Sequence, residues 1–132
     1  EVAPAAVISE PIPVIWGDSD RLTQVLTNIV ENAVRHGEGL RELQVRELNR
    51  KGSQGVEISI ADQGPGIDED LRERVFSRFW RSGPGAGSGL GMFIVRGVID
   101  QHGGTIDIDD ADEGGALIRL WLPVNEPDTL TD

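Results

Sequence analysis

The sequence predicts an α+β fold, a two-layer α/β sandwich in which a mixed, mostly antiparallel sheet carries helices on one face. Helical periodicity and strand alternation are mixed along the chain, and this pattern favours such a sandwich over a parallel doubly wound fold. Expected strands at 105–109 and 116–122 flank a glycine-containing turn, which indicates an antiparallel hairpin. A chain of 132 residues is long enough for one domain with a buried core.

The first helix is expected over residues 19–36, after a short strand at 14–16. Asp18 or Ser19 can accept hydrogen bonds from the free N–H groups at its start, and Gly37 follows where a glycine commonly ends a helix. Apolar residues recur every three or four positions, as on one buried helix face. They are Leu22, Val25, Leu26, Ile29, Val30 and Ala33.

Four further elements are expected before the hairpin. A strand is expected near 43–48, and strict alternation of apolar and polar residues predicts another at 56–62. A weaker helix is expected over 69–79. The helix expected over 90–101 is apolar nearly all round, which is typical of a helix sandwiched between other elements.

Composition and charge exclude several classes of protein. The 12 Lys and Arg residues against 23 Asp and Glu give a formal net charge of −11, which argues against nucleic acid or an anionic membrane surface as a partner. The absence of cysteine excludes disulfides, zinc–cysteine sites and cysteine nucleophiles. We expect one domain over residues 1–123 and a flexible tail over 124–132, and the start at Glu1 suggests a fragment or a processed chain.

A polar column on the first helix is the first candidate site. Asn28 and Asn32 are four residues apart, so they stack on one helix face, and Arg35 continues the column. The column lies beside the apolar stripe, so these groups would border a cavity next to the helix. An amide oxygen is a suitable Mg²⁺ ligand and an arginine a suitable phosphate partner. The alternative is that these asparagines are ordinary polar residues of the helix surface with no ligand.

Asp62 is the sharper candidate. Strand alternation places it on the apolar face of strand 56–62, where a carboxylate is costly unless a partner satisfies it. Gly64 and Gly66 follow, and they allow a tight bend and close approach of the backbone to a ligand. We expect Asp62 to accept a hydrogen bond from an exocyclic amino group such as that of adenine. The alternative is that Asp62 caps the next helix or accepts a hydrogen bond within a turn.

A glycine-rich run over 83–91 leads into the expected helix 90–101. Free N–H groups and the helix dipole make such a junction a possible anion site, and a plain flexible linker is the alternative. Met92 stands where a dinucleotide-binding glycine motif would need glycine, and the single lysine, Lys51, is in the wrong place for a Walker loop.

The remaining candidates are weaker. His36 and His102 have no partner at metal-binding spacing, and we expect His102 to be a structural residue at a helix end. The acidic run over 107–113 lacks the spacing of a calcium loop, and a solvated hairpin is the better interpretation.

Four segments in this order resemble the sequence boxes of the catalytic ATP-binding domain of bacterial two-component sensor histidine kinases. Residues 24–36 resemble the N box, Asp62-Gln-Gly-Pro-Gly66-Ile the first glycine box, 76–81 the F box, and Gly87-Ser-Gly-Leu-Gly91 the second glycine box. The resemblance spans about 14–123. These kinases form one branch of the gyrase, chaperone, histidine kinase and mismatch-repair ATPases (GHKL), which share the Bergerat ATP-binding fold.

The resemblance implies that residues 1–123 are a catalytic domain that binds ATP with Mg²⁺ and donates the γ-phosphoryl group to a histidine on a dimerisation and phosphoacceptor domain. It implies Asn32 as the Mg²⁺ ligand, Asp62 as the adenine acceptor, and Asn28, Asn32 and Arg81 as the catalytic residues, with Arg81 in a lid over the phosphates. The implied nucleotide-binding residues are Asn28, Asn32, Arg35, His36, Asp62, Gly64, Gly66, Ile67, Gly87, Ser88, Gly89, Leu90 and Gly91.

One position separates the branches of this superfamily. In the hydrolytic members, the residue four before the Mg²⁺-binding asparagine is typically a glutamate that activates water, and here it is Asn28. Glu31 points about 100° away from Asn32 around the helix, so it is a poor substitute. This favours transfer to a histidine. The alternatives are a hydrolytic ATPase and a regulatory nucleotide-binding module, and the five residues between Arg81 and Gly87 make a short lid for this family.

No phosphoacceptor helix, with its histidine followed by an acidic residue, occurs in the chain. We therefore expect an excised, monomeric and cytoplasmic domain that cannot phosphorylate itself. Its expected partners are ATP, the phosphoacceptor domain of the same parent kinase and, indirectly, a response regulator, with no nucleic acid. Whether the parent protein is anchored in a membrane is left open.

Overall fold

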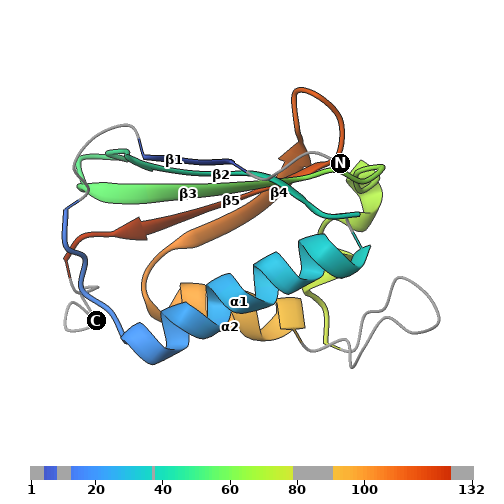
Figure 1. Ribbon diagram of the computed structural model, residues 1–132. Helices are drawn as coiled ribbons and strands as arrows, with labels where there is room; N and C mark the ends of the chain where they lie inside the picture. Colours follow the sequence, from blue (N-terminus) through green and yellow to red (C-terminus); the bar gives the residue numbers. More distant parts are fainter. Residues whose placement is uncertain (1–4, 9–12, 37, 79–90, 126–132) are drawn as a thin grey trace.

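The computed structural model describes residues 5–8, 13–36, 38–78 and 91–125. One sheet forms a layer, and two α-helices lie side by side against one of its faces (Figure 1). The predicted α+β sandwich is confirmed.

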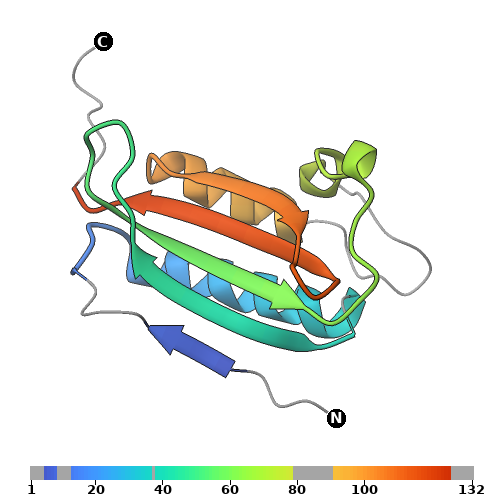
Figure 2. The same ribbon diagram turned by 90° about the horizontal axis from the view of Figure 1, so that it is seen from above.

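The sheet has five strands in the order β1-β2-β3-β5-β4, and Figure 2 looks onto it with the helices behind. Strand β1 pairs with β2 in parallel, and the other neighbours are antiparallel, so the sheet is mixed and mostly antiparallel. The elements are β1 (Ala5–Ile8), α1 (Ser19–His36), β2 (Leu40–Glu47), β3 (Gly55–Asp62), the 3₁₀ turns η1 (Glu69–Leu71) and η2 (Arg74–Phe76), α2 (Gly91–Gln101), β4 (Thr105–Asp110) and β5 (Ala116–Pro123).

Helix α1 begins and ends where the sequence predicts. Of the two expected cap residues, Asp18 is the one that caps: its Oδ1 accepts the backbone N–H groups of Asp20 at 3.0 Å and Arg21 at 3.2 Å. Beyond the helix, the Gly39 N–H donates to the Ala33 carbonyl at 3.0 Å, with Gly39 at φ +112°. Gly37, the expected stop, lies outside the described residues.

The core lies between the helices and the sheet. Helix α1 contributes the buried side chains of its predicted apolar stripe, including Val25 and Ile29, while Leu22, Leu26 and Val30 are partly buried. Apolar residues of β3, β4 and β5 face both helices across this layer. Helix α2 was expected to be sandwiched between other elements, and it is not. Phe93 is 43% exposed on its outer face, because no further layer covers it in the described part of the chain.

Two predictions of local structure are wrong, and one strand was not predicted. The helix expected at 69–79 is two 3₁₀ turns, because Val75 and Phe76 turn into the core and Ser77 is already extended at ψ 148°. Residues 14–16 form no strand, and only the Trp16 N–H bonds the sheet end, at the Val124 carbonyl, 2.8 Å away. The edge strand β1 carries only four residues, too few to show alternation, and was not expected.

His102 joins the two helices at the end opposite the β3–η1 loop. It is 5% exposed, its Nδ1 lies 2.8 Å from the Val98 carbonyl oxygen, and its Nε2 accepts the Asp18 N–H at 3.0 Å. Because Nε2 accepts, Nδ1 is the nitrogen that donates to the Val98 carbonyl. The expected structural role of His102 at a helix end is confirmed.

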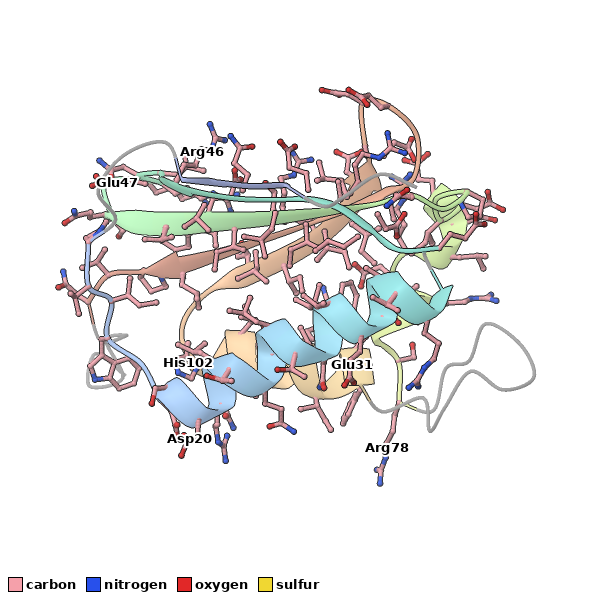
Figure 3. All side chains as sticks on the ribbon, viewed as in Figure 1. Asp20, Glu31, Arg46, Glu47, Arg78 and His102 are labelled. Atoms are coloured by element: carbon pink, nitrogen blue, oxygen red, sulfur yellow. The ribbon has the colours of Figure 1, made fainter. Side chains whose placement is uncertain are left out.

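The other face of the sheet carries polar groups, among them Arg46 (Figure 3). There Arg46 Nε donates to Glu57, which is only 5% exposed, at 2.8 Å. Trp121 lies so close to Gly55 that a Cβ at position 55 would stand 2.3 Å from the ring. Within the described ranges, neither α-helix has the length and hydropathy to cross a membrane.

Candidate functional site

Asp62 is the last residue of β3 and lies half-buried at the end of the sheet. Its Oδ1 accepts two backbone N–H groups, from Gly64 at 3.0 Å and from Ala116 of β5 at 2.9 Å. Within the described residues, no hydrogen bond reaches its Oδ2. One oxygen therefore fixes the carboxylate, and the other keeps its acceptor capacity.

The β4–β5 turn approaches Asp62 very closely. Gly115 is buried with φ +91°, and a Cβ there would lie 2.3 Å from the Asp62 carbonyl oxygen and 2.8 Å from Oδ1. Only glycine allows this approach, which brings the Ala116 N–H to the carboxylate. The sequence shows Gly115 as a turn residue, but nothing in it indicates the partner.

The loop after Asp62 is held at both ends. The Gln63 N–H donates to the Gly39 carbonyl and its Nε2 donates to the Leu40 carbonyl, each at 2.9 Å. Gly66 has φ +87°, the conformation for which the sequence suggested glycine. Ile67 packs against the core, and its carbonyl accepts a hydrogen bond from Arg72 Nε at 3.0 Å.

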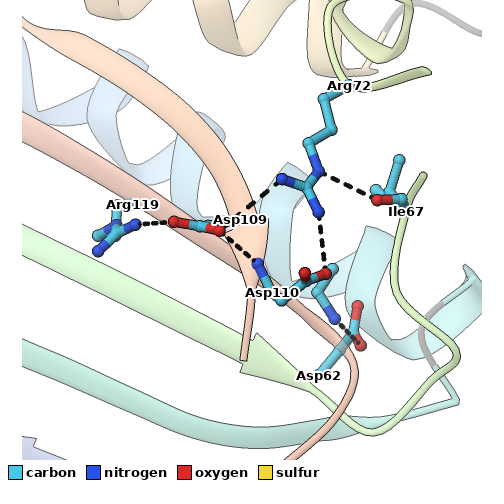
Figure 4. Close-up of polar contacts among 7 residues, drawn as sticks. Asp62, Ile67, Arg72, Asp109, Asp110 and Arg119 are labelled. Atoms are coloured by element: carbon cyan, nitrogen blue, oxygen red, sulfur yellow. Dashed lines mark hydrogen bonds and ion pairs between the residues drawn. The ribbon is translucent and has the colours of Figure 1, made fainter. Parts of the chain in front are cut away.

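Arg72 continues into a cluster on the β4–β5 hairpin (Figure 4). It donates to Asp110 Oδ1 at 2.9 Å and lies 3.7 Å from Asp109 Oδ1, while Arg119 bonds Asp109 from β5. The Asp110 N–H, with Arg119 and Arg72, holds the pKa of Asp109 below its ordinary value. The acidic run is thus a solvated hairpin, as expected, but two of its carboxylates are bound by arginines that sequence reasoning missed.

The polar column of α1 lies at the same end of the molecule, where α1 ends, α2 begins and the loop after β3 turns (Figure 1). Asn28 and Asn32 are half-buried and Arg35 is exposed. Asn28 Nδ2 donates to the carbonyl of Gly91, the first residue of α2, at 3.4 Å. In the described part of the chain, the side chains of Asn32 and Arg35 have no hydrogen bond. Glu31 is exposed.

Several residues of the predicted site are not among those that the structure describes. Arg81, Gly87, Ser88, Gly89 and Leu90 lie outside the described residues, as does the side chain of His36. The described residues contain no group of three or more His, Asp or Glu side chains placed to hold a metal ion. A single asparagine oxygen still fits Mg²⁺, because Mg²⁺ in proteins commonly keeps waters and is completed by substrate phosphates.

Comparison with known proteins decides the family. The family of histidine kinase-, DNA gyrase B- and HSP90-like ATPases matches residues 17–126. The chain belongs to this family. Sensor histidine kinase ZraS of Escherichia coli O157:H7 is 37% identical to it over 121 residues, which cover 89% of this chain and 25% of that protein. The adaptive-response sensory kinase SasA of Nostoc sp. is 35% identical over 120 residues, covering 89% and 30%.

Solved structures agree with this assignment. The crystal structure of full-length ShkA in complex with AMPPNP matches 96% of this chain and 26% of that chain, with a TM-score of 0.77 at 31% identity. The mycobacterial sensor histidine kinase MprB matches 94% of this chain and 84% of that chain, with a TM-score of 0.70 at 34% identity.

The resemblance to the ATP-binding catalytic domain of sensor histidine kinases is therefore confirmed. The chain spans about a quarter of the length of the curated relative ZraS.

Proposed function

We propose that this domain binds Mg·ATP at the end of the sheet where β3 meets the polar face of α1, and donates the γ-phosphoryl group to a histidine of a separate phosphoacceptor domain. Asp62 carries the proposal: one carboxylate oxygen is fixed by two backbone N–H groups, and the other has no partner in the described part of the chain. The family match and the AMPPNP complex of ShkA support ATP as the ligand.

Asp62 would recognise the base through its Oδ2. The exocyclic amino group of adenine is a donor, so it can satisfy this acceptor. Guanine carries a carbonyl oxygen at the same ring position, which would face the carboxylate acceptor to acceptor. The site therefore favours adenine over guanine. Gly64, Gly66 and Ile67 shape the loop beside the base.

Asn32 would hold Mg²⁺ through its amide oxygen, and Asn28 would lie beside it on the phosphate side. Bound Mg²⁺ neutralises the charge that develops on the transferring phosphoryl group. Asn28 also ties α1 to Gly91 at the start of α2, so it fixes the two helices relative to each other. We assign Arg35, His36, Arg81 and the residues of 87–91 to the nucleotide by the family resemblance.

Transfer is favoured over hydrolysis because, among the described residues, no carboxylate occupies the helix position from which it would activate water. Asn28 occupies that position and has no basic oxygen, and Glu31 is exposed on another side of α1. In the proposed reaction, the imidazole nitrogen of the acceptor histidine forms a bond to the γ-phosphorus. The bond from that phosphorus to the β,γ-bridging oxygen breaks, ADP leaves, and the imidazole proton passes to solvent.

The test mixes the domain with the phosphoacceptor domain of its parent kinase, Mg²⁺ and γ-labelled ATP. We expect label on the acceptor domain, and none on a matched acceptor whose histidine is replaced by alanine. Tight ATP binding without labelling would overturn transfer and leave a regulatory nucleotide-binding module. Steady phosphate release by the isolated domain would indicate a hydrolytic ATPase.

A further inference from the structure

Arg72 makes two hydrogen bonds that connect different parts of the chain. Its Nε donates to the Ile67 carbonyl at 3.0 Å, and its terminal nitrogen donates to Asp110 Oδ1 on the β4–β5 hairpin at 2.9 Å. The Arg72 side chain is 19% exposed, so its stem is packed while Asp110 is open to solvent. The guanidinium thus holds the end of the loop after Asp62 against the hairpin (Figure 4).

The same hairpin holds the beginning of that loop. The Ala116 N–H donates to Asp62 Oδ1 at 2.9 Å, and Gly115 packs directly against the Asp62 backbone. Asp62 and Ile67 therefore both have their position set by one rigid element. Any displacement of Ile67 relative to the hairpin must be taken up by the intervening loop, which begins at Asp62.

An arginine is required for this arrangement. Nε and a terminal nitrogen of one planar fork reach two acceptors in different directions, whereas a lysine ammonium offers one flexible point charge. The pair with Asp110 contributes little to overall stability, since the carboxylate is 75% exposed and solvent screens it. Loss of the Asp110 pair should therefore change the position of the loop, which Arg72 holds through the Ile67 carbonyl, more than it changes the stability of the fold.

We propose that Arg72 is a positioning residue for recognition of the nucleotide base. By holding the Ile67 carbonyl against the β4–β5 hairpin, it keeps the Asp62 carboxylate where it can accept a hydrogen bond from the base. This inference rests on the proposed binding of ATP through Asp62. Arg72 acts through the loop and through Asp62, and it is not assigned a contact with the nucleotide.

The experiment measures the dissociation constants for ATP and GTP, and the thermal midpoint of the nucleotide-free domain, for four proteins. They are the wild type and the variants Arg72→Gln, Arg72→Lys and Arg119→Gln. Arg119→Gln is the matched control, because Arg119 pairs with Asp109 on the same hairpin but does not touch the loop.

We expect Arg72→Gln and Arg72→Lys to weaken ATP binding by about tenfold, with GTP binding changed much less, so that the preference for ATP falls. Arg119→Gln should keep the wild-type affinity and preference. The thermal midpoints of all three variants should stay within a few degrees of the wild type. If Arg72→Gln does not fold, Asp110→Asn removes the charge from the same contact and should lower the ATP preference in the same direction.

Adding the variant Asp62→Asn distinguishes failure of the role of Arg72 from failure of the proposed ATP binding through Asp62. Loss of ATP binding in Asp62→Asn with unchanged ATP preference in Arg72→Gln would overturn the role of Arg72 alone. An equal loss in Arg72→Gln and Arg119→Gln would also overturn it, because the effect would then be a general one on the hairpin. A wild-type domain that binds ATP and GTP equally, with Asp62→Asn unchanged, would overturn both proposals.

Discussion

Gly115 lies so close to Asp62 that a Cβ at position 115 would stand 2.3 Å from the Asp62 carbonyl oxygen and 2.8 Å from its Oδ1. The two residues are far apart in sequence, and a side chain at 115 would remove the contact between them. The glycine therefore lets the hairpin donate the Ala116 N–H to the carboxylate at 2.9 Å. The orientation of Asp62 depends on the hairpin turn as much as on its own strand.

Gly115→Ala should therefore weaken ATP binding as well as the fold. Alanine at φ +91° costs about 1–2 kcal/mol in backbone strain, and the Cβ contact must also displace Asp62. Gly114→Ala is the matched control, since Gly114 has φ +94° with nothing within 4 Å of the added Cβ. Urea unfolding and ATP titration of both variants check the prediction. Equal affinity in the two variants would show that the contact with Asp62 does not matter for binding.

Asp62→Asn should reduce ATP affinity severely while the domain stays folded. The amide oxygen can still accept from Gly64 and Ala116, so the amide nitrogen then takes the place of Oδ2. A donor would face the amino group of adenine, and we expect a loss of roughly a hundredfold or more. The same donor suits the carbonyl oxygen of guanine, so relative GTP affinity should rise. Calorimetric titration with both nucleotides measures this, and an unaltered ATP constant would contradict the adenine assignment.

Asn32→Ala should chiefly remove the Mg²⁺ dependence of ATP binding. The Asn32 side chain is half-buried and has no hydrogen bond in the described part of the chain, so its removal leaves no protein group without a partner. We expect ATP affinity in the presence of Mg²⁺ to fall about tenfold, to near the value measured with chelator. Glu31→Ala, one position away and exposed, is the control and should behave as wild type. A full Mg²⁺ response in Asn32→Ala would remove this residue from the metal site.

The fold could be predicted where local signals and tertiary packing agree. Helix α1 has a cap, a stripe and a stop in its own sequence, and residues 19–36 follow from these alone. The expected helix at 69–79 fails because its local pattern is overridden by the burial of Val75 and Phe76 and by Arg72, which reaches back to Ile67. Strand β1 depends on its pairing with β2, which a four-residue segment does not reveal.

The site divides in the same way. Asp62 is visible in the sequence, because a carboxylate on an apolar strand face requires a partner. Arg72 and Gly115 are not, because their roles depend on contacts between distant parts of the sequence. Arg72 reaches Asp110, 38 positions further on, and Gly115 lets Ala116 reach Asp62, 54 positions back. Each has an ordinary local explanation, as a helical arginine or a turn glycine. Only the fold shows that both act on the same carboxylate loop.

His102→Ala should destabilise the domain without a specific effect on nucleotide binding. The change removes a buried ring and leaves the Asp18 N–H without its acceptor, while the Val98 carbonyl keeps only the backbone N–H of residue 102, 3.1 Å away. Together these losses should cost roughly 2–4 kcal/mol. Urea unfolding measures the loss, and ATP affinity at a temperature where the variant is folded should match the wild type. A larger effect on affinity than on stability would assign His102 a role at the site.

Low pH should weaken the contact between Arg96 of α2 and Glu73, which directly precedes η2. Arg96 donates to Glu73 at 2.9 Å and lies over the Phe76 ring, 4.5 Å from its centroid. This hydrogen bond, and then the charge of Arg96, lowers the pKa of Glu73 from its ordinary 4.5. Because the folded pKa is the lower one, the stabilisation is full above pH 4.5 and is lost as the pH falls through the folded value. Glu73 is exposed, so the effect is small.

The measurement compares the thermal midpoint of the wild type with that of Glu73→Gln as the pH is lowered from about 6 to about 3. Glutamine keeps a hydrogen-bond acceptor for Arg96 but does not titrate, so this variant should start with a lower midpoint at neutral pH. The gap between the two proteins should then narrow in acid, because protonation makes Glu73 neutral in the wild type too. High salt should reduce the gap at neutral pH, since the pair is open to solvent. A gap that widens as the pH falls would have the opposite sign and show that Glu73 is not stabilised as its anion by Arg96.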